Sequence, residues 1–206
     1  MAEGAGAARA AARAARFARA KFRPPALPAT LIKRPELHEL LVAGSGQRLT
    51  VVVGSAGAGK TVLLSGWAAE RPPGFTSWLS CDRADADPAR FWAGFIEAPR
   101  AIERGFGTDA ADLLAIDQTM SPDVTASVVN DVAKLPAGSA IIVDDFHYAS
   151  ASVARDMTDL IERWPAIRSR CWRSGGSERL ASTSWTVSAG QRSMRSVMSL
   201  ATAADA

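Results

Sequence analysis

Short apolar runs alternate with amphipathic runs along the middle of this chain. Apolar runs of strand length cover residues 49–53, 75–80 and 140–143, and a Gly or Asp bounds each of them. The segments that repeat their apolar positions with the period of a helix are residues 34–43, 60–69, 87–96, 121–135 and 152–164. Strands that alternate with helices predict an α/β fold with a parallel sheet flanked by helices.

Capping residues support these helix boundaries. Asp87 and Ser121 each precede a proline, and a short polar residue followed by proline is typical of a helix start. Pro35 stands in the first turn of the 34–43 segment, and Gly44 follows its end. The apolar pattern and the local capping signals therefore predict the same helices.

The two ends of the chain differ from this middle region. Residues 1–20 contain eleven Ala and four Arg with almost no apolar face, so we expect a low-complexity extension there. Residues 166–206 contain nine Ser and show no sustained period of 2 or 3.6. Because such a segment buries little apolar surface to offset the entropy of ordering it, we expect a poorly ordered Ser/Arg-rich tail. The sequence thus predicts one domain, at residues 21–165.

Composition narrows the class of protein. Hydrophobic residues make up 48% and charged residues 22% of the 206 residues, which is a globular balance. No apolar run approaches the roughly 18 residues that a membrane-spanning helix needs. Cys81 and Cys171 have no partner motif, which argues against a disulfide scaffold or a zinc site. We therefore expect a cytoplasmic protein.

The positive charge of the chain lies at its ends. The formal net charge is +3, yet residues 21–165 carry 14 Lys and Arg against 18 Asp and Glu. A nucleic-acid-binding protein would gather its basic residues on the folded part. We therefore expect no direct, sequence-specific DNA binding by this chain.

Residues 54–61 match the phosphate-binding pattern G-x-x-x-x-G-K-[ST] between a predicted strand and a predicted helix. Glycines let successive backbone N–H groups point at phosphate oxygens, and the following helix directs its positive end at the same anion. Lys60 would contact the β- and γ-phosphates, and the Thr61 hydroxyl would bind Mg²⁺. The predicted nucleotide-binding residues of this loop are Gly54, Ser55, Ala56, Gly57, Ala58, Gly59, Lys60 and Thr61. The alternative is a glycine-rich turn that binds nothing.

Two carboxylates follow the last predicted strand. In an open α/β sheet, ligands bind at the carboxyl ends of the strands, where Asp144 and Asp145 lie. Asp144 is the predicted Mg²⁺ ligand beside Thr61, and Asp145 is the predicted catalytic residue that orients or deprotonates an attacking water. Adjacent acids at a strand end are also common as plain turn residues. The phosphate-loop pattern upstream favours the metal interpretation.

Several ordered motifs carry a resemblance to a known family. They are Lys21–Pro25, Leu31–Arg34, the loop sequence GSAGAGKT, Trp67, Trp78–Asp82, Asp87–Phe91 and Asp144–His147. With these motifs, residues 21–165 resemble the ATPase domain of MalT-type LuxR-family transcriptional regulators, which are STAND-class P-loop NTPases. The resemblance implies that bound ATP or ADP sets an on/off state and that slow hydrolysis resets it. It also implies that Phe22–Arg34 borders the adenine, with Arg34 as the polar contact.

The family pattern stops after Pro165. By the resemblance, an apolar strand ending in Ser-Arg should follow and should lie between the phosphate-loop strand and the Asp144 strand, but residues 166–176 are rich in Arg and Ser. Such a switch is typical of a shifted reading frame. We therefore expect a partial P-loop NTPase domain, incomplete at its C-terminal end, with open inner edges on two strands. Thr183–Val187 is the β-prone stretch that could substitute for the missing strand.

Other polar and aromatic residues have structural interpretations. We expect Trp67 and Trp78 in the core. His147 could sense the γ-phosphate, but a single His after a strand is more often structural. The acidic residues expected in a cap and a solvated loop, and not in a second metal site, are Asp82, Asp85 and Asp87.

Three functions are compatible with this sequence. The leading hypothesis is an ATP-binding switch module of a MalT-type regulator that lacks the DNA-binding domain, with ATP or ADP and Mg²⁺ as cofactors and weak ATPase activity. A small P-loop kinase would need an Arg-bearing lid and an acceptor pocket, and neither is visible. The third hypothesis is a non-functional truncated fragment. The expected partners are the nucleotide and either a second copy of the chain or a full-length regulator.

Overall fold

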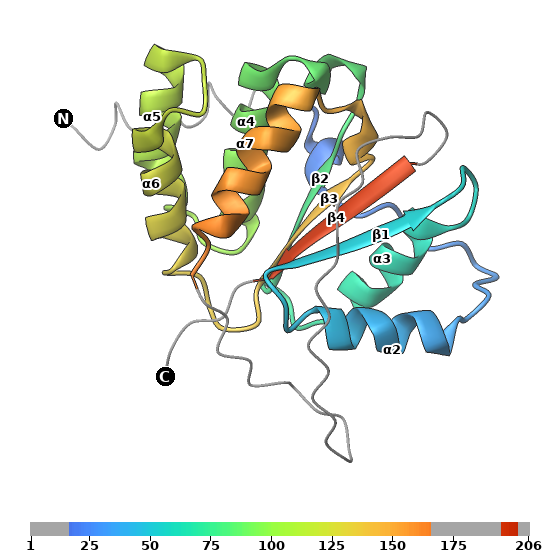
Figure 1. Cartoon of the computed structure of the whole chain (residues 1–206). Helices are drawn as coiled ribbons and strands as arrows, with labels where there is room; N and C mark the ends of the chain where they lie inside the picture. The colour runs from blue at the N-terminus through green and yellow to red at the C-terminus, as the bar shows by residue number, and fades with distance from the viewer. Residues whose placement is uncertain (1–16, 166–194, 202–206) are drawn as a thin grey trace.

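Six helices and a four-stranded sheet make up the computed structural model, which describes residues 17–165 and 195–201 (Figure 1). The strands are β1 (Leu49–Gly54), β2 (Thr76–Ser80), β3 (Ala140–Asp144) and β4 (Arg195–Ala201). The helices are α2 (Pro35–Gly44), α3 (Lys60–Ala69), α4 (Pro88–Glu97), α5 (Thr108–Asp117), α6 (Pro122–Val132) and α7 (Ala151–Glu162). Short 3₁₀ turns are η1 (Arg19–Phe22), η2 (Arg83–Ala86), η3 (Ala98–Ala101) and η4 (Phe146–Tyr148).

Helices α4 and α6 begin where the capping signals predicted, since the side chains of Asp87 and Ser121 accept backbone N–H groups from their first turns. The side chain of Ser150, which was not predicted as a cap, does the same for α7. The three predicted strands and five predicted helices are confirmed, with boundaries that differ by at most three residues. Helix α5 was not predicted, because only Ala110 and Leu114 of its residues are buried and its apolar pattern is correspondingly weak.

The strand order in the sheet is β1-β4-β3-β2. Strand β2 pairs in parallel with β3, whereas β4 is antiparallel to both of its neighbours, β1 and β3. Strands β1, β2 and β3 therefore all point the same way, and their carboxyl ends lie at one edge of the sheet.

Strand β4 corrects two expectations. A parallel sheet with open inner edges was predicted, but β4 occupies the position between β1 and β3 and makes the sheet mixed. The two flanking strands offer backbone N–H and C=O groups that any extended segment can pair with, so this pairing needs no strong apolar pattern. Thr183–Val187, the substitute that the sequence indicated, lies outside the described residues.

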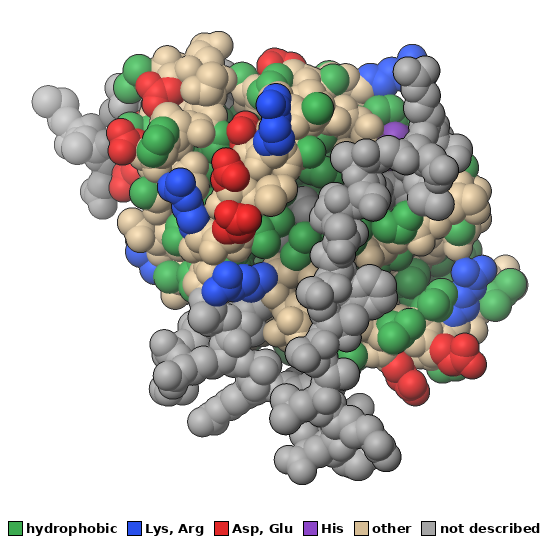
Figure 2. Space-filling model, viewed as in Figure 1, with side chains coloured by type: hydrophobic (Ala, Val, Ile, Leu, Met, Phe, Trp, Pro, Cys, Tyr) green, Lys and Arg blue, Asp and Glu red, His purple; other side chains and the backbone are tan. Residues whose placement is uncertain are grey.

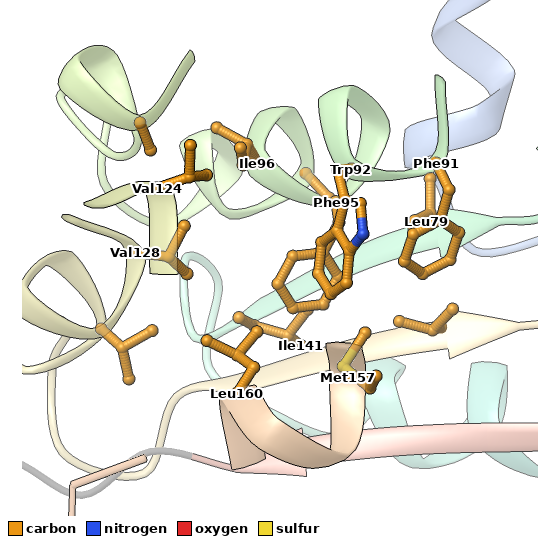
Figure 3. Packing of buried hydrophobic residues seen from close by; sticks show 14 of the residues in the cluster. Leu79, Phe91, Trp92, Phe95, Ile96, Val124, Val128, Ile141, Met157 and Leu160 are labelled. Atoms are coloured by element: carbon orange, nitrogen blue, oxygen red, sulfur yellow. The ribbon is translucent and has the colours of Figure 1, made fainter. Parts of the chain in front are cut away.

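Alternate residues of the central strands face two hydrophobic clusters. On one face, Ile141 and Val143 pack with residues of α4, α6 and α7, and Figure 3 shows Trp92 and Phe95 projecting from α4 towards Ile141 of the sheet. On the other face, Ala140 and Ile142 pack with residues of α2 and α3. This second cluster also contains Trp67 and Trp78, whose predicted core positions are confirmed.

Strand β1 is less covered than the central strands. Val51 and Val53 remain exposed, and so do Leu37, Leu40 and Val42 of the adjacent helix α2. Hydrophobic side chains are accordingly visible on the surface over α2 in Figure 2. In the part of the chain that the structure describes, β4 is the single strand that pairs with β1.

Residues 17–34 form an amino-terminal strap, which packs through η1 against the edge strand β2. Phe17 is buried, and its ring lies edge-on to that of Phe22 with the centroids 5.6 Å apart. The guanidinium of Arg90 lies over the ring of Phe17, 5.1 Å from the ring centroid. The strap thus covers the outer side of β2.

Among the described residues, no helix has the length and apolar content that crossing a membrane requires.

Two isoleucines allow the core to be tested with one chemical change. Ile141 of β3 is 0% exposed and Ile116 of α5 is 78% exposed. We expect Ile141→Ala to lower the free energy of unfolding by about 2–5 kcal/mol, because it leaves a cavity under α4 and α7. Ile116→Ala should stay within about 0.5 kcal/mol of the wild type. Urea unfolding followed by tryptophan fluorescence measures both, and equal losses would contradict the described core.

Candidate functional site

The glycine-rich loop, Gly54–Thr61, connects β1 to α3 at the carboxyl edge of the sheet. Gly57 and Gly59 adopt the left-handed conformation, with φ of +77° and +81°. An L side chain would be strained at both positions. A Cβ atom placed on either glycine would meet no heavy atom within 4 Å. The loop therefore has open space beside its backbone, and the glycines keep it open.

Helix α3 begins without a side-chain cap. Its N-cap residue is Gly59, so no side chain accepts the N–H groups of its first turn. Helices α2 and α5 also lack a side-chain cap, whereas α4, α6 and α7 each have a capping Asp or Ser. The first N–H groups of a helix have no partner within the helix. They also carry the positive end of the helix dipole, equivalent to about half a unit charge. The start of α3 can therefore accept an anion.

Lys60 lies folded against the loop. Its Nζ donates to the carbonyl oxygens of Gly54, at 2.8 Å, and Ser55, at 2.9 Å. An ammonium group has three donors and no acceptor, and carbonyl oxygens are weaker partners for it than a charged oxygen. The arrangement holds a cation directly beside the open side of the loop.

A hydrogen bond joins the loop to the end of β3. The Thr61 hydroxyl donates to Asp144 Oδ1 at 3.1 Å, and the backbone N–H of Asp145 donates to the same oxygen at 3.0 Å. Asp144 is 3% exposed, and burial raises the pKa of its carboxyl above the ordinary value. The Thr61 and Asp145 hydrogen bonds and the Lys60 charge oppose this rise. A hydroxyl and a carboxylate, both hard oxygen ligands, thus lie side by side.

Asp145 occupies a turn with unusual backbone geometry. Its φ is +56°, in the left-handed region that few residues other than Gly, Asn and Asp adopt. The carboxylate is half-buried, and its Oδ1 lies 3.5 Å from Nδ1 of His147. The His147 ring in turn lies against that of Tyr148, with centroids 4.1 Å apart. The turn therefore presents a carboxylate beside an imidazole, next to Asp144.

Arg34 at the end of the strap reaches the same loop. Its Nη1 donates to the carbonyl oxygen of Ala58 at 3.1 Å, and the side chain is otherwise exposed. The Arg34 guanidinium and the Lys60 ammonium thus both contact carbonyls of this loop.

The structure brings the predicted site residues together. Lys60 and Arg34 bond to carbonyl oxygens of the loop, Thr61 bonds to Asp144, and the backbone of Asp145 bonds to Asp144 as well.

The acidic turn after β2 differs in part from the expectation. Asp82 caps η2 and Asp87 caps α4, as predicted. Asp85, however, is 1% exposed and not in a solvated loop, because the ammonium of Lys21 is bonded to it. The sequence could not indicate this, since Lys21 and Asp85 lie 64 positions apart and neither has a local pattern that signals burial.

Comparison with known proteins shows distant similarity to large regulators. No protein-family model matches the chain. The chain is 27% identical over 138 residues to the serine/threonine-protein kinase PknK of Mycobacterium tuberculosis, which covers 64% of this chain and 12% of PknK. It is 29% identical over 135 residues to the HTH-type transcriptional regulator MalT of Cronobacter sakazakii, covering 65% of this chain and 15% of MalT. The MalT of Vibrio cholerae is 27% identical over 117 residues.

These identities support the resemblance to MalT-type regulators as a distant relationship. The chain spans only 12% to 15% of the length of the PknK and MalT proteins above. The α/β sheet flanked by helices is compatible with a P-loop-like fold.

The burial of Asp144 predicts a pH-dependent stability. Because the folded state raises the pKa of this carboxyl above its ordinary value of 3.8, the native protein binds the proton more readily than the unfolded chain does. The burial of Asp144 therefore lowers stability increasingly as the pH rises through the raised pKa. Asp144→Asn keeps an oxygen that accepts from Thr61 and does not ionise.

In buffer with EDTA, we expect Asp144→Asn to melt at a higher temperature than the wild type at pH 7. The difference should shrink as the pH falls towards 3.8, where the wild-type carboxyl is also neutral in the folded state. Thermal melts at several pH values measure this difference. A melting-temperature difference that does not change with pH would contradict the account of Asp144.

Proposed function

We propose that this chain is a nucleotide-binding module that holds ATP or ADP with Mg²⁺, hydrolyses ATP slowly, and acts as a switch within a regulator of the MalT type. One observation carries the proposal. The uncapped start of α3, the Lys60 ammonium and the Thr61–Asp144 pair meet at the carboxyl edge of the sheet.

The loop suits the phosphates of a nucleotide. The exposed loop backbone at Gly57 and Gly59 and the first turn of α3 offer N–H donors to anionic oxygens. Lys60 would leave the carbonyls of Gly54 and Ser55 for a phosphate oxygen, which is a stronger partner because it is charged. Phosphate would thus replace interactions that the free protein makes within its own loop.

Thr61 and Asp144 are the residues that would hold Mg²⁺. Mg²⁺ is bound through one or two protein oxygens, with substrate phosphates and water as the other ligands, and these two side chains offer that set. When bound, the ion would neutralise charge on the phosphates. The hydrogen bonds from Thr61 and from the N–H of Asp145 hold the Asp144 carboxylate in one orientation.

Asp145 is the residue that would act on water. Its carboxylate lies beside Asp144 and is half-buried, so it can accept a proton from a water molecule at the edge of the loop. His147 would fix the orientation of that carboxylate through the 3.5 Å contact with Oδ1. Arg34, already bonded to Ala58, would contact the base or ribose side of the nucleotide.

The regulatory setting comes from the relatives. MalT is named as a transcriptional regulator with a helix-turn-helix, and PknK as a protein kinase. We propose that the present chain corresponds to a nucleotide-dependent part of such a regulator in the cytoplasm. It would bind no DNA itself and would act through a second copy or a full-length regulator.

Two substitutions separate binding from hydrolysis. Lys60→Ala should weaken binding of a fluorescent ATP analogue about 10- to 100-fold, because it removes a charge-assisted contact to phosphate. Asp145→Asn should bind nearly as the wild type does and lose most of the ATP turnover, since Asp145 acts on water. Fluorescence titration and a phosphate-release assay measure the two effects.

Lys134→Ala is the matched control, since it removes a lysine that pairs with Asp131 on α6. Equal losses of affinity in Lys60→Ala and Asp145→Asn would contradict the assigned roles. Release of inorganic phosphate without a phosphoryl acceptor would distinguish hydrolysis from the activity of a small kinase.

A further inference from the structure

Lys21 is a buried cation with two carboxylate partners. Its side chain is 6% exposed, and its Nζ donates to Asp85 Oδ2 at 2.5 Å and to Asp82 Oδ2 at 2.9 Å. Asp85 Oδ2 also accepts the backbone N–H of Asp82 at 2.6 Å, while Arg90 Nε lies 3.8 Å from the other oxygen. We call the three residues Lys21, Asp82 and Asp85 the latch.

Fixing the relative positions of two segments explains the latch better than a gain in the free energy of unfolding does. Burying charges costs desolvation free energy that their attraction rarely exceeds, and apolar residues of similar size often stabilise a protein as well. What a buried, hydrogen-bonded ion pair adds is a single fixed arrangement of the segments that it joins. Here it joins the amino-terminal strap to the turn after β2.

The turn that the latch holds adjoins the catalytic candidates. Turn η2, which contains Asp85, packs against η4, the 146–148 turn that follows Asp145 and carries His147. Cys81, just before η2, donates its backbone N–H to the carbonyl oxygen of Asp144 at 2.9 Å. A shift of the 82–86 turn would therefore move the backbone of Asp144 and the turn that presents Asp145.

The strap also connects the latch to the glycine-rich loop. Residues 24–34 lead from the latch to Arg34, which bonds to Ala58, and Pro24, Pro25 and Pro28 restrict the backbone of this stretch. Between Lys21 and Arg34, residues 23–33 are exposed. The strap is thus held at Lys21, which pairs with the acidic turn, and at Arg34, which bonds to the glycine-rich loop.

We propose that Lys21 is a positioning residue for the nucleotide site. By binding Asp82 and Asp85 it fixes the 82–86 turn against the Asp145–Tyr148 turn and sets the start of the strap that delivers Arg34 to the loop. This role rests on the proposed function, because it acts on the same site.

Two double variants with the same charge changes test this role. Lys21→Met with Asp85→Asn removes the latch without leaving a buried charge unpaired. Arg23→Met with Asp87→Asn removes an exposed strap cation and a nearby carboxylate that are not in the latch, and Asn still caps α4. Both are made in the full 206-residue chain.

The readouts are ATP turnover, trypsin cleavage and the thermal melt. Turnover in the latch variant should fall about tenfold relative to the control variant, because small displacements of catalytic groups cost this much or more. Trypsin should cut the bond between Lys33 and Arg34 about tenfold faster, since a strap released at the latch can adopt the extended conformation that a protease binds. Within residues 22–34 this is the single bond that trypsin cuts readily, because Arg23 and Arg34 precede prolines.

The outcomes separate the positioning role from the proposed function. A latch variant that melts cooperatively, yet matches the control in turnover and cleavage, overturns the positioning role alone. A wild-type chain with no nucleotide binding or turnover overturns the proposed function and the positioning role with it. Should the latch variant fail to fold, Asp82→Asn replaces it, since that side chain is 55% exposed and Asn keeps the η2 cap. Its turnover and cleavage must then shift in the same directions.

Discussion

Strands β1 and β3 point the same way although no hydrogen bond joins them, because each is antiparallel to β4 between them. This constraint places the glycine-rich loop and the Asp144 turn at one edge of the sheet, two strand widths apart, or about 10 Å. The Thr61–Asp144 hydrogen bond then closes the remaining gap. The contact between the glycine-rich loop and the Asp144 turn, and with it the proposed Mg²⁺ position, depends on this shared edge.

The candidate site contains features that are rare in a hydrophobic core because they lower stability. Asp144 is buried with a raised pKa, Asp145 has a left-handed backbone, and the start of α3 lacks a cap. Each of these features lowers stability on its own, and such features concentrate where a protein binds a ligand or performs chemistry. The apolar clusters on the two faces of the sheet, with Trp92 and Trp67 among their members, compensate for them.

Local sequence was sufficient to predict where the fold places those residues of the candidate site that depend on local structure. The loop from Gly54 to Thr61 was placed because a strand, a glycine pattern and a helix follow one another within 21 residues, 49–69. Asp144 was placed because it ends an apolar strand, and its contact with Thr61 then follows from parallel strand directions. Boundaries at Asp87 and Ser121 followed from capping.

The interactions that could not be predicted are long-range. The seven residues of β4 alternate apolar residues with Ser only weakly, and their place in the sheet follows from the backbone groups that β1 and β3 offer. The ion pair between Lys21 and Asp85 spans 64 positions, so no local period could indicate that both are buried. Asp85 was expected in solvent for this reason.

Amide hydrogen exchange of the full chain, with and without Mg-ADP, tests the central claim most directly. If the glycine-rich loop and the start of α3 donate their N–H groups to phosphate, exchange should slow at residues 54–64 and, to a lesser degree, at residues 144–148. Unchanged exchange in the 54–64 segment at saturating nucleotide, or slowing confined to other parts of the chain, would contradict the assignment of this loop as the phosphate site.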